Sequence, residues 1–352
     1  MDKNSYFGTS SSLTTPQHVP LVPIISDKHL SLLLPIIIYW VYSGMYHLIS
    51  IYRIPFFEKY RIRSLEETKT KNKISSSEVI KGVIVQQFLQ TVLGFIVVAA
   101  EEEQVLPDDN AEILGLSQTL ETYSTSFGIG HHIRPHKQIL AEYSYWYLIP
   151  VVKFFFAMFL LDTWQYFMHR LFHQNAFLYR HIHSRHHRLY APYAFGALYN
   201  HPIEGFLFDS LGATIAFTLS GLSVKGASID HVCLQVSFDD NYLMCRTVDD
   251  HSGYDIPFNP IQRIFGNNAI YHDIHHQTYG LKKNFSQPFF TFWDRIFGTY
   301  LPYHEVPKVL EEDSSRDIAD DDDDPQALKK SKTMESRTSS KRYNLRSRKN
   351  IS

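Results

Sequence analysis

The amino-acid sequence predicts an all-α protein with about four membrane helices, a cytoplasmic histidine-rich helical cap and a disordered C-terminal tail. Three observations predict this fold class. Apolar runs of membrane-spanning length recur up to Leu222, clustered histidines follow the third run, and the last residues form an acidic and then a basic block. We divide the chain into a polar N-terminal segment (1–28), membrane helices with loops (29–150), a histidine-rich domain (151–304) and a tail (305–352).

Four apolar runs are candidate membrane helices. His29–Tyr52 contains no Lys, Arg, Asp or Glu and is long enough to cross a hydrocarbon layer of about 30 Å. Val79–Ala100, Tyr147–Met168 and Gly205–Leu222 are also of spanning length, although the first two of these include the charged residues Lys81, Lys153 and Asp162. The alternative, core helices of a soluble protein, is disfavoured because the first run is apolar on every side.

The segment after the fourth run is a poor candidate for a returning membrane helix. Ser223–Val248 carries five charged residues, Lys225, Asp230, Asp239, Asp240 and Arg246. Each charge at the centre of a bilayer costs on the order of 2.5 to 3.5 kcal/mol on insertion scales. We therefore expect the polar part, Ala227–Arg246, to depart from an ordinary membrane helix.

Charge in the loops predicts the orientation. The loop after the first run is basic and therefore expected to be cytoplasmic. Its positive residues are Arg53, Lys59, Arg61, Arg63, Lys69, Lys71 and Lys73. The next loop begins with Glu101–Glu103, includes Asp108 and Asp109, and is expected on the opposite side. The third helix then returns, which places His169 at its cytoplasmic mouth.

The tail differs from the rest of the chain. Glu311–Asp324 is strongly acidic and Lys329–Lys349 is strongly basic, so both are predicted to be disordered. The basic block also fits a nuclear or nucleic-acid signal, but beside membrane helices we favour a solvated or headgroup-facing tail. The formal net charge of −2 gives the whole chain no field that attracts nucleic acid.

Histidines form three clusters. His169 and His173 are four residues apart and share one helical face, close to that of Asp162. Two further clusters have the HxxHH spacing, and a single histidine stands in TVDDH. The nine candidate metal ligands are His169, His173, His183, His186, His187, His251, His272, His275 and His276. Residues predicted to support them are Asp162, His201 and Asp250.

The number of clustered histidines indicates a site for two metals. Zinc hydrolases need about three protein ligands, and their HExxH signature is absent from this sequence. The Glu-x-x-His pairs of soluble di-iron bundles are also absent. Two cysteines, Cys233 and Cys245, are too few for a thiolate site. Nine imidazoles suit two first-row metals. Paired iron can activate O2 for the oxidation of a lipid that enters from the bilayer.

Four segments resemble the fatty acid hydroxylase superfamily, and within it the sphingoid-base 4-hydroxylases. They are HRLFH, HSRHHRLYAPYAFGALYNHPIEG, TVDDHSGYDIP and NNAIYHDIHHQTYGLKKNFSQPFFTFWDRIFGTY. The resemblance implies that the nine histidines are ligands of two iron ions in a catalytic domain over 151–304. It further implies a membrane enzyme of the endoplasmic reticulum, with its C-terminus in the cytoplasm, that hydroxylates carbon 4 of a dihydrosphingoid chain with O2.

The resemblance also implies the source of electrons. They are expected from NADH or NADPH through cytochrome b5 and its reductase, and both are separate proteins because the HPGG haem motif is missing. Two alternatives stay open. One is another lipid oxidation of the superfamily, by a sterol desaturase or a methylsterol oxidase. The other is a non-catalytic metal-binding membrane protein.

Overall fold

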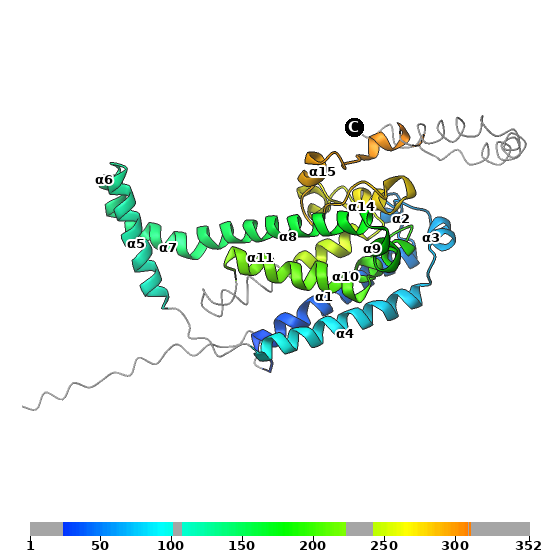
Figure 1. Ribbon diagram of the computed structural model, residues 1–352, viewed down its shortest axis with the longest axis horizontal. Coiled ribbons are helices and arrows are strands. Elements are labelled where there is room, and N and C mark those ends of the chain that lie inside the picture. The colour runs from blue at the N-terminus through cyan, green and yellow to red at the C-terminus, as the bar shows by residue number, and fades with distance from the viewer. Residues whose placement is uncertain (1–23, 101–107, 223–241, 309, 311–352) are drawn as a thin grey trace, which may run out of the picture. The chain divides into compact units, whose positions relative to one another are not determined.

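A computed structural model describes residues 24–100, 108–222, 242–308 and 310 of the protein (Figure 1). Across these ranges the backbone is helical or irregular, with no strand longer than an isolated bridge. The all-α prediction is therefore confirmed. Nearly all of the segments predicted to be a polar N-terminus and a disordered tail lie outside the described residues, as do residues 223–241.

The first two long helices lie side by side (Figure 1). A capping box begins the short helix in the loop between them: the Ser64 hydroxyl accepts the N–H of Glu67, whose carboxylate accepts the N–H of Ser64. Pro35 lies inside the first helix, as membrane helices tolerate. The elements are α1 (Asp27–Tyr52), α2 (Pro55–Glu58), α3 (Leu65–Lys71) and α4 (Ser76–Ala100).

The acidic stretch expected to be a loop is partly helical. Residues Asp109–Ser126 form α5, and the Asp108 side chain caps its first turn by accepting the N–H groups of Asn110 and Ala111. Asp108 and Asp109 thus stabilise the positive end of a helix dipole. These acidic residues lie between the candidate membrane spans Ser76–Val97 and Gly130–Gln174, as the loop prediction requires, but the helix within this connection was not predicted.

The third long helix extends well beyond the predicted Tyr147–Met168. It is continuous over Gly130–Gln174, so its last turns carry His169 and His173 past the apolar part. At about 1.5 Å per residue, 45 residues reach roughly twice the hydrocarbon thickness of a bilayer. The run comprises α6 (Gly130–Ile133), η1 (Arg134–His136), α7 (Lys137–Tyr143), the π-helix η2 (Ser144–Leu148) and α8 (Ile149–Gln174).

Shorter elements follow α8. The π-helix η5 leads into α11, which packs along α8 (Figure 1). Gly205 permits a close approach, because a Cβ atom there would lie 1.5 Å from Nε2 of Gln86 on α4. The elements are α9 (Ala176–His181), η3 (His183–Arg188), η4 (Ala194–Leu198), α10 (Pro202–Gly205), η5 (Phe206–Leu211) and α11 (Gly212–Ser220).

The rest of the first compact unit, which ends at Tyr300, is mainly short helices and turns. The residues 242–250 form a helix, followed by α13 (Pro260–Ile264), α14 (Ala269–His276), η7 (Thr278–Gly280) and α15 (Phe292–Ile296). Residues 301–352 form a separate unit, whose described part contains η8 (Tyr303–Glu305).

Four helical runs within the described residues are long and apolar enough to cross a membrane. They are His29–Tyr52, Ser76–Val97, Gly130–Gln174 and Pro202–Ser220. Large apolar side chains on them are exposed, for example Val41, Phe88 and Phe155, as expected of surfaces that face lipid. The protein is therefore a multi-pass membrane protein.

Candidate metal centre

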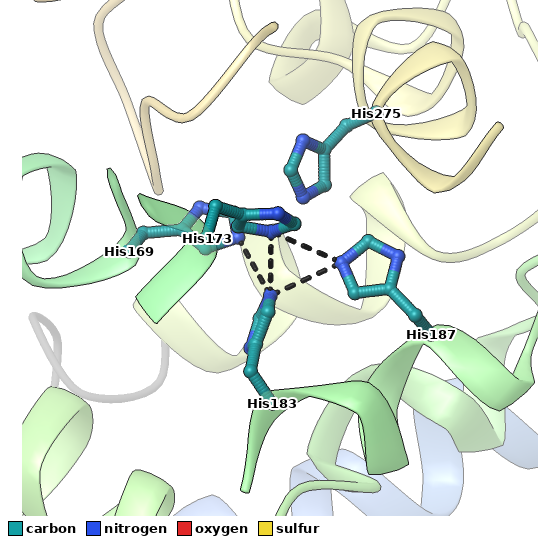
Figure 2. Close-up of side chains that lie close together, drawn as sticks. All are labelled: His169, His173, His183, His187 and His275. Atoms are coloured by element: carbon teal, nitrogen blue, oxygen red, sulfur yellow. Dashed lines mark hydrogen bonds between the residues drawn. The ribbon is translucent and has the colours of Figure 1, made fainter. Parts of the chain in front are cut away.

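The first histidine group, group 1, contains His169 and His173 from α8, His183 and His187 from η3, and His275 from α14 (Figure 2). One ring nitrogen of each lies within 4.8 Å of all the others. His183 Nε2 is central: it lies 2.8 Å from His173 Nε2 and 3.1 Å from His169 Nε2. Three helices that are separate in sequence thus aim five imidazoles at one point.

The second histidine group, group 2, contains His186, His251, His272 and His276, all of them buried. His272 and His276 come from α14, His186 from η3, and His251 directly follows the helix over residues 242–250. The Nε2 atoms of His272 and His251 are 2.9 Å apart, and those of His276 and His186 are 3.1 Å apart. The structure therefore brings together all nine predicted ligands, in sets of five and four.

The two HxxHH clusters each contribute to both groups. His183 and His187 enter group 1, whereas His186 between them enters group 2. In α14 the pattern is reversed: His272 and His276 enter group 2, whereas His275 enters group 1. The outer pair of each cluster shares a face, as the spacing predicts, although η3 is a 3₁₀-helix. Each middle histidine crosses to the other group, which couples the two.

The hydrogen bonds of the rings show which nitrogens face inward. His169, His275 and His276 each donate a hydrogen bond from Nδ1 to a backbone carbonyl, at 2.7 to 2.8 Å. A carbonyl oxygen only accepts, so these Nδ1 atoms carry the proton and Nε2 has a bare lone pair. His251 is held the same way by the Thr247 carbonyl at 2.9 Å.

Converging lone pairs repel one another unless a cation lies between them. Two nitrogens bound at right angles to one first-row metal, each at about 2.1 Å, lie about 3.0 Å apart. The observed Nε2 separations of 2.8 to 3.4 Å bracket that value. His275 Nε2 is buried and has no hydrogen-bond partner among the described residues. The donor set therefore fits one metal ion in each group.

Burial keeps these imidazoles neutral. Removal from water lowers the pKa of His186, His251 and His275 to about 3, and it lowers the pKa of His187, His272 and His276 well below the usual range. Desolvation disfavours the charged imidazolium, and neighbouring histidines add to this effect. Neutral imidazole is the form that binds metal, so the environment prepares the ligands for coordination.

A carboxylate not anticipated from the sequence supports group 1. Glu204 is 2% exposed, and its Oε1 accepts a hydrogen bond from His183 Nδ1 at 2.6 Å. Such carboxylate–histidine pairs fix the ring and raise the basicity of the ligand. The sequence feature that could have indicated this role is that Glu204, in NHPIEG, is an isolated acidic residue directly before an apolar run of membrane-spanning length.

A second unanticipated contact holds α14. The Arg63 guanidinium donates to both carboxylate oxygens of Asp273, at 2.7 to 3.1 Å, and Asp273 follows His272 directly. The pair is largely buried, with 17% and 6% of the two side chains exposed. Arg63 therefore does more than contribute positive charge to the loop, because it also fixes the helix that carries three histidines.

The three residues predicted to support the ligands make other contacts. Asp162 accepts the backbone N–H groups of Phe289 and Phe290, at 2.7 and 3.0 Å. His201 caps α10 by accepting the N–H of Ile203. Asp250 lies 3.0 Å from the Arg246 guanidinium. In the described part of the chain, these side chains hold loops, a helix start and an arginine close to the histidine groups.

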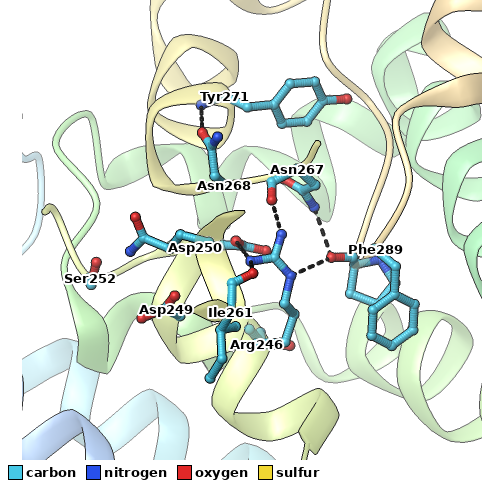
Figure 3. A network of polar contacts seen from close by, with 12 residues as sticks. Arg246, Asp249, Asp250, Ser252, Ile261, Asn267, Asn268, Tyr271 and Phe289 are labelled. Atoms are coloured by element: carbon cyan, nitrogen blue, oxygen red, sulfur yellow. Dashed lines mark hydrogen bonds and ion pairs between the residues drawn. The ribbon is translucent and has the colours of Figure 1, made fainter. Parts of the chain in front are cut away.

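Arg246 is buried in protein (Figure 3). Its guanidinium donates to the carbonyls of Pro288, Ile261 and Asn267, and it pairs with Asp250. Residues 242–250 form a helix in which this charge is compensated by protein groups, and the helix is not among the candidate membrane spans of the described residues, so the expected departure from an ordinary membrane helix is not contradicted. The other charges of Ser223–Val248 that argued against insertion lie outside the described residues.

Comparisons with known proteins match the part of the chain that carries both histidine groups. The family model for "Fatty acid hydroxylase" matches residues 154–299, the region that contains all nine histidines. The sphingolipid C4-hydroxylase of Schizosaccharomyces pombe is 43% identical over 77% of this chain and 88% of its own length. Sphinganine C4-monooxygenase 1 of Arabidopsis thaliana is 44% identical over 79% of this chain and 90% of its own.

A relative with a differently named activity is nearly as similar. A very-long-chain aldehyde decarbonylase of Oryza sativa subsp. japonica is 40% identical over 82% of this chain and 94% of its own length. No solved structure matches the chain.

Proposed function

Because the chain belongs to the fatty acid hydroxylase family, we propose that it hydroxylates C4 of sphinganine or dihydroceramide to give phytosphingosine or phytoceramide. The chain is an oxidoreductase, and its relatives with this activity match it over most of their length. One structural observation carries the proposal. Both histidine groups border a cavity of about 260 Å³, and the walls of that cavity come from helices of membrane-spanning length.

The nine histidines are the proposed ligands of two iron ions, five for one and four for the other. Paired iron supplies the chemistry that an unactivated methylene requires, namely activation of O2 for insertion into a C–H bond. The chain's own contribution is to hold neutral imidazoles in place through the carbonyls and the carboxylate that bind their Nδ1 atoms. Its membrane helices give a lipid direct access to the cavity.

The reaction needs two electrons from outside the chain. One oxygen atom enters the C4–H bond and the other leaves as water, so each turnover consumes two electrons and two protons. We propose NAD(P)H as their source, with a separate cytochrome b5 and its reductase as carriers. In support, Arg180, Arg185 and Arg188 border one cleft beside η3, the helix that holds ligands of both groups. Such a basic face suits an acidic electron-transfer protein.

We also propose that the protein resides in the endoplasmic reticulum with both histidine groups in the cytoplasm. The basic loop between α1 and α4 supports this orientation, because positive loops stay on the cytoplasmic side. Arg63 of that loop contacts α14 directly, so loop and histidines lie on the same side of the membrane.

Lipid mass spectrometry tests the proposal. The full chain is expressed in cells that lack their own sphinganine 4-hydroxylase, and sphingoid bases and ceramides are analysed after growth in air. We expect 4-hydroxylated products from the wild type and from His136→Ala, which changes an exposed histidine outside both groups. Absence of these products, with the protein present in the membrane, would refute the proposal.

One similarity favours a second reaction, the conversion of very-long-chain aldehydes to hydrocarbons: the Oryza sativa relative, 40% identical to this chain, is a very-long-chain aldehyde decarbonylase. The same lipid extracts distinguish the two. Accumulation of hydrocarbons one carbon shorter than the cellular aldehydes, without 4-hydroxylated bases, would replace the first proposal with the second.

A further inference from the structure

The cavity has an apolar body and a polar wall. The polar part of its lining includes His183 of group 1 and His186, His251 and His272 of group 2. Along its sides lie apolar residues of α1 and α11, including Leu32, Ile36 and Ala213. A long alkyl chain can therefore lie in the body of this cavity while atoms near one end of the molecule reach both histidine groups.

Polar side chains gather on one part of this wall, within helices that are otherwise apolar. Asp209 of η5 is an ionisable residue inside a membrane-length helix, where such residues are expensive and usually functional. Gln90 of α4 donates from Nε2 to Asp209 Oδ2 at 3.3 Å and to the carbonyl of Gly205 at 3.4 Å. These are long hydrogen bonds, so the amide compensates the carboxylate only weakly.

Two neighbouring side chains on the same cavity offer polar atoms without partners. Glu204 uses Oε1 to hold His183, and its Oε2 is buried with no hydrogen-bond partner among the described residues. Gln87 is 7% exposed and accepts from Trp40 through Oε1, whereas its Nε2 has no partner in the same part of the chain. Buried polar atoms are normally paired, so such atoms around a cavity point to a polar ligand.

We propose that Asp209, Glu204, Gln87 and Gln90 bind the polar head of the lipid, with the Asp209 carboxylate taking a protonated primary amine. This inference rests on the proposed function. Carbon 4 is two bonds from the carbon that bears the nitrogen in a sphingoid base, so the head must bind beside the reacting position. Glu204 meets this condition, because it touches His183 and lines the same cavity as Asp209. Gln87 Nε2 is a donor for a hydroxyl of the head.

The charge of the site selects the form of the substrate. The nitrogen of a free long-chain base is a cationic ammonium, whereas the nitrogen of a ceramide is a neutral amide. Hydrogen bonds between ionised groups are roughly twice as strong as neutral ones. The site therefore favours free sphinganine over dihydroceramide as the substrate.

Equilibrium binding to the purified full-length protein under nitrogen tests this inference without turnover. The probes are sphinganine and N-acetylsphinganine, which differ in the charge on nitrogen. For Asp209→Asn we expect the Kd of sphinganine to rise roughly tenfold or more, while the Kd of N-acetylsphinganine changes less than about twofold. The control Thr214→Ala removes a polar atom from the adjacent helix, outside the cavity lining, and should bind both probes as the wild type does.

Three results would overturn the inference: no binding of sphinganine by the wild type, an unchanged Kd for sphinganine in Asp209→Asn, or equal losses for both probes. Equal metal content of wild type and variant excludes a folding defect as the cause of a selective loss. The proposed function is judged separately by its products. Selective amine binding without hydroxylation refutes that function and leaves this site standing.

Discussion

The two histidine groups have similar nitrogen spacing but different surroundings. Group 1 has five nitrogens, two of them on the long helix α8, and Glu204 holds one of its rings. Group 2 has four nitrogens, and backbone carbonyls hold the rings of His186, His251 and His276. The cavity is lined by three members of group 2 and by one member of group 1. Group 2 thus supplies most of the histidine lining of the cavity and is buried throughout, whereas His173 and His187 of group 1 are only partly buried and do not line it.

Replacement of His186 or His275, the histidines that cross between the groups, should cause the largest losses of hydroxylation. The two variants should differ in the number of metal ions that they retain. His186→Ala leaves group 2 with three nitrogens, whereas His275→Ala leaves group 1 with four, the number that group 2 has in the wild type. We expect hydroxylation to fall by on the order of a hundredfold or more in both variants. Metal analysis of the purified proteins should find one ion lost in His186→Ala and both retained, with less affinity, in His275→Ala.

His136→Ala serves as the matched control for these variants and should keep both metal content and activity. Full hydroxylation in either crossing variant would contradict the two-metal site. Equal metal loss in the two would remove the contrast between the groups.

Replacement of Glu204, the carboxylate that holds a ring of group 1, should cause the next largest loss of metal affinity or activity. Glu204→Gln replaces a charged partner of His183 by a neutral one of the same shape, which lowers the basicity of that ligand. We expect a loss of about 10- to 100-fold in metal affinity or activity, confined to the ion of group 1. Titration of the purified apoprotein with iron measures this directly. Weakening of both sites to the same degree would show that Glu204 acts on the fold as a whole.

The Arg63–Asp273 pair should have a smaller effect on chemistry, exerted through α14. Arg63→Ala leaves the Asp273 carboxylate buried without its guanidinium, and we expect a loss of about 3 kcal/mol in the free energy of unfolding. Activity per folded molecule should fall less than in Glu204→Gln. Thermal unfolding of the metal-loaded protein in detergent gives the stability, and an unchanged Tm would show that α14 is held by other contacts.

Removal of the tail should have the smallest effect. A chain ending before Asp320 lacks only residues outside the described part, and it keeps all nine histidines and the cavity wall. Turnover by the truncated protein is therefore expected to equal that of the full chain in the same membranes. A large loss would mean that the tail takes part in binding a partner or the lipid surface.

The sequence predicted the donor set better than its arrangement. Spacing identified eight of the nine histidines, because residues three or four positions apart on a helix lie near one another, a local property, and the resemblance to the family added His251. It did not show that His186 and His275 cross between groups, because that depends on how η3 meets α14 in three dimensions. The partners Glu204 and Arg63 were missed for the same reason, since each contacts a residue distant in the chain.

The features of the fold that were not predicted from the sequence also have physical causes. Hydropathy counted Arg246 as a cost to a membrane helix, whereas three carbonyls and Asp250 surround it in the folded protein. The acidic connection before the third span was interpreted only by its charge, so α5, which Asp108 caps, was not predicted. Composition thus found the long apolar helices, but it could not separate charges exposed to lipid from charges satisfied by protein.

Metal analysis of the purified, full-length, active protein tests the central claim most directly. Iron and zinc are measured per chain by elemental mass spectrometry in a preparation that also shows hydroxylation. The account predicts about two iron ions per chain, one for each histidine group. One metal ion per chain, or zinc in place of iron in a fully active preparation, would contradict it.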